Sequence, residues 1–382
     1  MIDWATLQEW QTDWLHVDPS QIQKRRRFLI DALSREQTHV TRAMNTLRNG
    51  RLRLVREYAD IFTDQLELDS SVSTTLNPHR LLELAEKPWA DQKPDAQRWF
   101  ESISRFDQAV AVAKIEMSDS YEMLARDIND LMDFLWGHLF EPVFEKIEVY
   151  CYHDPATGYA VSAEDVGIGH HLSRPGLKRR KSNLTCRKTM KGELAFFRHR
   201  IKDAFDAWLK SQRQVHDPEK KHPYTVYDRC GLTFIVPTMM ELHDVALQIV
   251  ELLLDHGGTE IEPLDTNFVA EQSIDATNRQ SSPAYKAAKT LIQFRGRVYE
   301  FQFLTFHDYF TSKRSLNDSN HDLYRLRQTL KYFLPLLWPK EIYAVDWGNP
   351  HIISSLRKWK INQLGLRVNG KHTSTHESSE DP

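Results

Sequence analysis

The hydrophobic pattern of this chain changes near Val149. From Phe28 to Tyr58, and again from Ile103 to Phe140, apolar residues recur every three or four positions with charged residues between them. This period predicts amphipathic helices. After Val149, short runs of β-branched and aromatic residues alternate with helical stretches, which predicts a mixed α/β sheet. The sequence therefore predicts the α+β class, with a helical domain followed by a sheet domain.

The domain boundaries are placed where the pattern changes. Four segments are predicted, namely a helical domain over 1–147, a domain with a mixed β-sheet over 148–312, C-terminal helices within 313–370, and a polar, disordered tail over 371–382. The C-terminal helices are expected over 320–335 and 349–360.

The sheet domain is predicted to alternate strands and helices. The expected strands cover 148–152, 224–236 and 293–303, and the expected helices cover 189–212 and 240–255. Gly296 stands between two apolar runs, and a glycine in such a place predicts the turn of a β-hairpin.

Composition limits the class of protein. The chain has 382 residues and a formal net charge of −3, so attraction to nucleic acid has to come from local patches. Its three cysteines, Cys151, Cys186 and Cys230, show no CxxC spacing, which argues against a disulfide framework or a zinc site. No secretory signal is visible, and the most apolar run, Ile249–Leu254, is far shorter than the ~20 residues that span a bilayer. These features predict a cytoplasmic protein with no membrane partner.

Two carboxylates, Asp228 and Glu300, stand in the β-prone runs Tyr224–Val236 and Val298–Leu304. Side chains alternate between the two faces of a strand. The three aromatic residues of the second run are therefore predicted to face the core, while Glu300 and Gln302 point together to a polar side. Taken alone, the simpler interpretation is that these are solvated strand residues.

A basic segment precedes both carboxylates. Between Arg174 and Lys191, eight of eighteen positions are Arg or Lys. Such a density suits polyphosphate or a nucleic-acid backbone, through charge and through the bidentate geometry of Arg. A basic run taken alone is more often an exposed, solvated segment.

The order of these features resembles the synthetase domain of the RelA/SpoT family. The family opens with R-x-K-x-x-x-S, which Arg179, Lys181 and Thr185 match with Thr in place of Ser, and Lys188 lies one place from the lysine that follows in the family. The family's D-x-x-G-x-R resembles the run Asp228–Thr233.

The remaining elements of the family follow in the same order. An acidic position after the first strand looks like Asp244. The family's N-x-x-x-x-G-Y-x-S-x-H-T resembles the run from Asn278 to Thr290, with Tyr285 as the aromatic residue and Lys289 at the His position. Its E-x-Q-x-R-T resembles Glu300–Thr305, which includes Gln302. The resemblance covers about residues 175–305.

The resemblance implies a nucleotidyltransferase-type fold and a transferase that moves pyrophosphate from ATP to the 3′-hydroxyl of a nucleotide, with Mg²⁺ as cofactor. It implies that Asp228 and Glu300 are the catalytic and metal-binding carboxylates, and that Glu300 can draw the proton from the attacking hydroxyl. The resemblance further implies nucleotide and phosphate contacts by Arg179, Lys181, Thr185, Lys188, Tyr285, Lys289 and Gln302, with a purine stacking on the tyrosine.

The family leaves two kinds of acceptor open. One branch makes alarmones of the (p)ppGpp type from ATP and GTP or GDP, and a toxin branch modifies the 3′ end of tRNA and blocks translation. An antitoxin or a regulatory protein is a further partner to consider. The first 147 residues contain no His-Asp pair, so the hydrolase domain of long RelA/SpoT proteins is not expected.

A second function stays open because four family positions differ. Thr233 and Leu304 stand where the family has Arg, Ala287 stands for Ser, and Lys289 stands for His. The alternative is a catalytically degenerate domain that senses nucleotides or binds proteins. Transfer of label from ATP to an acceptor separates the two.

Overall fold

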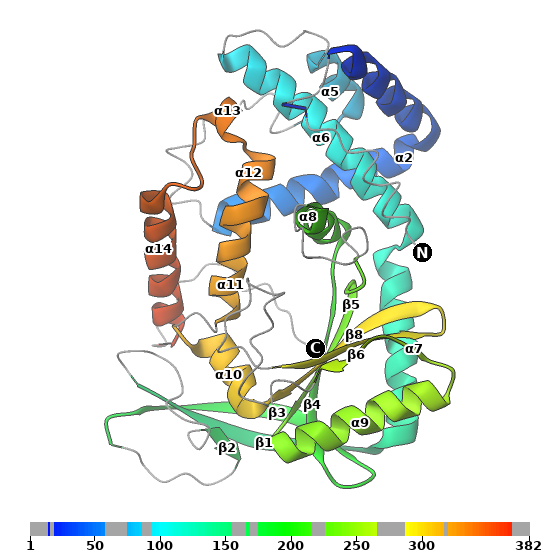
Figure 1. The fold of residues 1–382 in the computed structure, drawn as a ribbon. Coiled ribbons are helices and arrows are strands. Elements are labelled where there is room, and N and C mark those ends of the chain that lie inside the picture. Colours follow the sequence, from blue (N-terminus) through cyan, green and yellow to red (C-terminus); the bar gives the residue numbers. More distant parts are fainter. Residues whose placement is uncertain are drawn as a thin grey trace. The chain divides into compact units, whose positions relative to one another are not determined.

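The chain forms two compact units in a computed structural model (Figure 1), each assembled from separate segments of the chain. The helical unit holds residues 1–128, 201–230 and 330–349, and the sheet unit holds residues 129–200, 231–329 and 350–382. The structure describes residues 14–15, 19–57, 75–85, 93–154, 166–168, 175–215, 226–265, 287–316 and 320–368.

The helical unit is built on two long helices that pack against each other, α2 (Pro19–Glu57) and α6 (Lys93–Ser118). The apolar residues that predicted the first helix, including Leu33, Val40 and Leu47, are buried. Shorter helices complete the unit, namely α5 (Pro78–Leu84), α8 (Ala204–Val215), α12 (Leu334–Leu337) and α13 (Lys340–Tyr343). A π-helical turn, Thr329–Phe333, precedes α12.

Helix α8 approaches α2 closely at Gly50. A Cβ built on Gly50 would lie 2.1 Å from Cδ1 of Phe205, the second residue of α8. Phe205 is fully buried. Glycine costs about 1 kcal/mol in a helix relative to alanine, and here it is the residue that lets the aromatic ring reach the α2 backbone.

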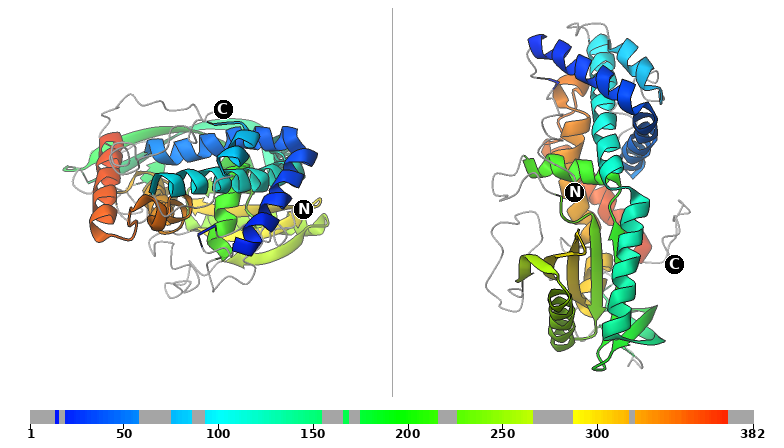
Figure 2. Two further views of the ribbon diagram at one scale, coloured as in Figure 1. Left: turned by 90° about the horizontal axis from the view of Figure 1, so that it is seen from above. Right: turned by 90° about the vertical axis from the view of Figure 1, so that its right-hand side faces the viewer.

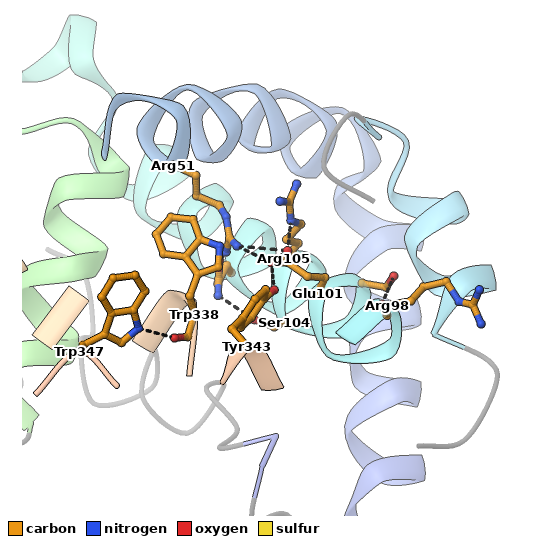
Figure 3. Close-up of polar contacts among 10 residues, drawn as sticks. Arg51, Arg98, Glu101, Ser104, Arg105, Trp338, Tyr343 and Trp347 are labelled. Carbon is orange, nitrogen blue, oxygen red and sulfur yellow. Dashed lines mark hydrogen bonds and ion pairs between the residues drawn. The ribbon is translucent and has the colours of Figure 1, made fainter. Parts of the chain in front are cut away.

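A buried polar network ties the C-terminal part of the helical unit to α6 (Figure 3). Arg51, Arg105 and Tyr343 all donate hydrogen bonds to the carboxylate of Glu101. Burial alone would raise the pKa of Glu101, but the charges of Arg51 and Arg105 outweigh it and hold the pKa below its ordinary value. The Arg51 guanidinium also lies 4.9 Å from the ring centroid of Trp338.

The sheet unit contains one eight-stranded sheet in the order β2-β1-β3-β4-β5-β8-β7-β6. The strands are β1 (Phe140–His153), β2 (Val166–Ile168), β3 (Lys178–Thr189), β4 (Leu194–Ile201), β5 (Cys230–Val236), β6 (Thr259–Asp265), β7 (Ala288–Phe294) and β8 (Arg297–Thr305). The long antiparallel ribbon of β1 and β3 forms one end of this sheet, with β2 at its edge.

The predicted hairpin is confirmed as β7 and β8, which pair from Phe294↔Arg297 to Ala288↔Phe303. Its two turn residues, Arg295 and Gly296, both have positive φ, at 48° and 82°. Positive φ at both central residues is the geometry of a type I′ turn, whose twist matches that of the strands.

Helices pack beside the sheet. Helix α9 (Met239–Asp255) begins at a capping box formed by Thr238 and Glu241 and contacts β6, β7 and β8 (Figure 2). The unit also includes the end of α7 (Tyr121–Leu139), α10 (Phe306–Arg314), α11 (His321–Gln328) and α14 (Pro350–Val368). No helix in the described part of the chain is both long enough and apolar enough to cross a membrane.

The α+β class with a mixed sheet is confirmed, as is the helix predicted over 240–255. The helix predicted over 189–212 was wrong in its first half, because residues 194–201 form β4 and the helix begins only at Ala204. The basic segment was not assigned to a strand, yet most of it is β3. β4 carries Arg198 and Arg200 on one face, and β3 carries Lys or Arg on both faces, which masks the apolar alternation. The tail over 371–382 lies outside the described residues.

Candidate functional site

The polar row predicted on β8 is present. Tyr299, Phe301 and Phe303 are buried, whereas Glu300 and Gln302 are partly exposed. Arg200, near the end of β4, donates a hydrogen bond of 2.6 Å to Oε2 of Glu300, and Nε2 of Gln302 donates one of 2.8 Å to the same oxygen. Lys289 of β7 pairs directly with Gln302, so the two side chains share a face of the sheet.

Gly231 of β5 makes room for Arg200. A Cβ built on Gly231 would lie 2.9 Å from Nε and 3.1 Å from Cγ of Arg200. These are interior atoms of the arginine side chain, so they cannot yield as easily as its tip. The Gly231 backbone therefore serves as the surface over which Arg200 crosses to reach Glu300.

Positive charge gathers around this pair. Arg198 of β4 donates a hydrogen bond of 2.8 Å to the hydroxyl of Tyr309 on α10. Part of the Lys313 side chain reaches solvent, yet its ammonium is crowded by protein, and this desolvation lowers its pKa. The charges of Arg198, Arg200 and Arg325 lower the Lys313 pKa further.

The same positive charges also lower the pKa of His321, the first residue of α11. Burial, followed by the charges of Lys313, Arg325 and Arg200, lowers its pKa to about 4 against the opposing effect of Asp322. The imidazole is therefore neutral at pH 7. A region with several guanidinium and ammonium groups and few carboxylates is suited to bind phosphate oxygens.

Asp228 belongs to the helical unit, and its position differs from the prediction. It lies in a turn immediately before β5, not inside a strand. Its carboxylate is buried, and Oδ2 is ion-paired with both Lys202 and Lys210. The neighbouring Arg229 donates hydrogen bonds to the carbonyl oxygens of Asp119 and Lys202. These contacts hold the turn against the start of α8.

The predicted phosphate-binding residues of the basic segment lie on β3. Lys181 is ion-paired with Glu148, and Lys188 lies 2.6 Å from a carboxylate oxygen of Glu145. Arg179 and Thr185 are exposed on the same strand. Tyr285 lies outside the described residues.

Three cations that contact the carboxylates were missed from the sequence, namely Arg200, Lys202 and Lys210. The sequence contains a spacing that could have identified them. The spacing R-x-K, followed eight positions later by Lys, is the spacing of the motif assigned to Arg179 and Lys181, and it occurs again at Arg200, Lys202 and Lys210 with Asp206 at the Ser position. In this second match Lys210 stands at the position of the motif's final lysine. In the first match Lys188 stands one residue before that position.

The carboxylates suit a magnesium ion that also binds phosphate. The described residues contain no group of three or more His, Cys, Asp or Glu side chains that could hold a metal by themselves. Mg²⁺ is commonly held by one or two carboxylates while phosphate oxygens and water supply the other ligands. Each carboxylate by itself, Asp228 in the helical unit or Glu300 in the sheet unit, suits such an ion only where phosphate oxygens and water complete its ligands.

No protein-family model matches this chain, and a comparison with curated proteins also finds no match.

Proposed function

We propose that this protein is a pyrophosphokinase of the RelA/SpoT type, which transfers pyrophosphate from ATP to a 3′-hydroxyl. The observation that carries the proposal is the position of Arg200. Arg200 donates a hydrogen bond to Glu300 of the E-x-Q element, and its side chain lies against the backbone of Gly231 in the D-x-x-G element. Arg200 is itself the first residue of an R-x-K element. Three elements far apart in the sequence thus meet at one side chain.

The chemistry assigns a role to each group. Glu300 accepts the proton of the acceptor hydroxyl, which requires a carboxylate within hydrogen-bond reach of that oxygen. Arg200, together with Lys313, neutralises phosphate charge. Asp228 is the proposed carboxylate ligand of Mg²⁺, and Lys202 and Lys210 contact phosphate oxygens. A bound Mg²⁺ supplies charge neutralisation of the polyphosphate and orientation of the attacked phosphorus.

The proposed substrates are ATP and a nucleotide acceptor, either free GTP or GDP or the 3′ end of tRNA. Such substrates belong to the cytoplasm. Purified protein incubated with ATP labelled in its β-phosphate, Mg²⁺ and each acceptor in turn is expected to move label into one of them. Arg200→Ala and Glu300→Gln are expected to remove the transfer, while Lys358→Ala on α14 is a control that keeps it. If no acceptor receives label from the wild-type protein, the enzyme proposal is wrong.

A second function is favoured by the ion pairs themselves. Glu300 is bonded to Arg200, and Asp228 is bonded to Lys202 and Lys210, so each carboxylate is compensated without a metal. This arrangement suits a domain that binds nucleotide and signals to a partner without turnover. Calorimetry that detects ATP binding with no label transfer to any acceptor would support this second function.

A further inference from the structure

The ribbon of β1 and β3 has two chemically different faces. On one face Val149, Cys151, Leu184 and Cys186 are buried in a hydrophobic cluster that includes Phe310 of α10. Residues paired across an antiparallel ribbon share a face. The pairs Phe144↔Arg187, Lys146↔Thr185, Glu148↔Asn183 and Tyr150↔Lys181 therefore lie on the opposite face, which we call the outer face.

The outer face is open to solvent over Phe144–Glu148, whereas Tyr152, which pairs with Arg179 at the other end of this face, is buried. Phe144 is 57% exposed, and Lys146, Glu148, Lys181, Asn183 and Thr185 are also exposed. Arg179, two residues before Lys181 on β3 and therefore on the same face, is exposed as well. More than half of the Phe144 side chain is exposed on this polar sheet face, and apolar surface left in water points to a partner.

Arginine side chains stack on the aromatic rings of this region. The Arg187 guanidinium lies 4.0 Å from the ring centroid of Phe144 and 4.6 Å from that of Trp136. The Arg179 guanidinium lies 5.5 Å from the ring centroid of Tyr150. The two stacks are separated by six residues along β1, a distance of roughly 20 Å at the rise of a strand. Cation–π contacts of this kind hold the cations beside aromatic faces.

The outer face carries positive charge on a chain whose net charge is negative. Within its described segments 144–150 and 179–187, Lys146, Arg179, Lys181 and Arg187 are cations and Glu148 is the carboxylate, which gives a local charge of +3. Glu148 is bonded to Lys181 and accepts a hydrogen bond of 2.7 Å from the Tyr150 hydroxyl. The positive charge is therefore local to this ribbon and does not follow from the composition of the whole chain.

We propose that the outer face of the β1–β3 ribbon binds single-stranded nucleic acid, with bases stacking on Phe144 and Tyr150 and phosphates contacting Arg179, Lys181 and Arg187. Single-strand binders combine a positive track along the backbone with exposed aromatic rings for the bases. The same chemistry fits RNA and single-stranded DNA. The resemblance alone implied phosphate contacts by Arg179 and Lys181. The proposed pyrophosphokinase instead uses Arg200, Lys202, Lys210 and Lys313 for phosphate, so the present inference does not depend on that activity.

Two other partners fit the face less well. An acidic peptide would use the cations but would bring no base to stack on the exposed Phe144 ring. An anionic membrane surface would require apolar residues along the face, and its centre instead holds Glu148, Asn183 and Thr185. These partners are outcomes of the test that would overturn the proposal.

Fluorescence anisotropy of labelled oligouridylate and oligothymidylate with the full chain tests the proposal. The double variant Arg179→Ala/Lys181→Ala is expected to weaken binding at least ~10-fold and to reduce the salt slope by about 1.4, at roughly 0.7 per lost phosphate contact. Phe144→Ala is expected to weaken binding by roughly tenfold with the salt slope unchanged, because stacking is not ionic. The matched control Arg357→Ala/Lys358→Ala removes the same charge from α14 and is expected to bind as wild type.

Glu300→Gln separates this proposal from the proposed function, since it is expected to lose transfer but keep oligonucleotide affinity. Thermal unfolding of each variant confirms that it is folded, and the exposed positions of Arg179 and Lys181 make loss of folding unexpected. The proposal is overturned if wild-type protein binds neither oligonucleotide, if the control weakens binding as much as Arg179→Ala/Lys181→Ala does, or if a polyglutamate peptide or anionic vesicles compete with equal strength.

Discussion

Arg200 lies so close to Gly231 that no side chain fits between them, since a Cβ on Gly231 would come within 2.9 Å of Nε of Arg200. The far end of the same arginine bonds to Glu300 at 2.6 Å. A glycine on β5 and a carboxylate on β8 are thus linked through one side chain of β4, and these strands are neighbours in the order β4-β5-β8.

Gly231→Ala is expected to displace Arg200 from Glu300. The variant should reduce pyrophosphate transfer roughly 100-fold, because misplacing a positioned group by about 1 Å can cost that much. Its melting temperature should also fall, because Nε and Cγ of Arg200 must shift to admit the methyl group. The fold should be retained, since the Arg200 side chain is partly exposed and can move toward solvent. Transfer assays and thermal unfolding are measured side by side. Normal transfer by a folded Gly231→Ala protein would show that the close approach has no functional role.

Glu300→Gln keeps the size of the side chain and one acceptor oxygen but removes the charge. Turnover is expected to fall at least ~100-fold, within the range for acid–base catalysis, while ATP affinity changes much less, because a base acts mainly in the transition state. Single-turnover kinetics and calorimetry measure the two quantities. Gln293→Ala, on the same face of β7, is the control, and equal loss in both variants would contradict a specific role for Glu300.

The polar row on β8 could be predicted because strand alternation is a local property that Glu300, Phe301 and Gln302 show by themselves. The environment of Glu300 could not. Arg200 lies one hundred positions earlier, on a strand that was predicted as part of the helix over 189–212. The chain contains two R-x-K spacings, at Arg179 and Arg200. The final lysine favours the second in the sequence, and the structure then shows that Arg200 bonds to Glu300, whereas Lys181 is paired with Glu148.

The environment of Asp228 could not be predicted from the sequence either. The β-prone residues after it predicted a strand, and β5 is present from Cys230. The turn that holds Asp228 depends on Lys202 and Lys210, which reach it from the region of α8. Such contacts between distant segments depend on tertiary packing. No periodic pattern in the sequence therefore predicts them.

Glu101→Gln is expected to destabilise the helical unit by about 3–5 kcal/mol. The substitution leaves Arg51 and Arg105 buried without a compensating carboxylate, and removing one partner of a buried ion pair carries that cost. Glu83→Gln breaks the exposed pair with Arg80 and should cost under about 1 kcal/mol. Urea unfolding of the two variants measures both values. Similar small losses in both would mean that the Glu101 network contributes little net stability.

His321 is expected to make stability depend on pH between about 4 and 6.5. Its pKa in the folded protein is about 4, lowered by burial and by Lys313, Arg325 and Arg200 against Asp322, whereas an unfolded histidine titrates near 6.5. The unfolded chain therefore binds more protons in this window, so the contribution of His321 is intact above about pH 6.5 and is lost progressively as the pH falls toward 4. Urea unfolding across this range should show a steeper decline for the wild-type protein than for His321→Gln, by at most about 3 kcal/mol in total. Parallel curves of stability against pH for the two proteins would contradict the lowered pKa of His321. NMR titration of the imidazole gives an independent check, and added pyrophosphate should raise the His321 pKa, because a bound anion offsets the surrounding positive charge.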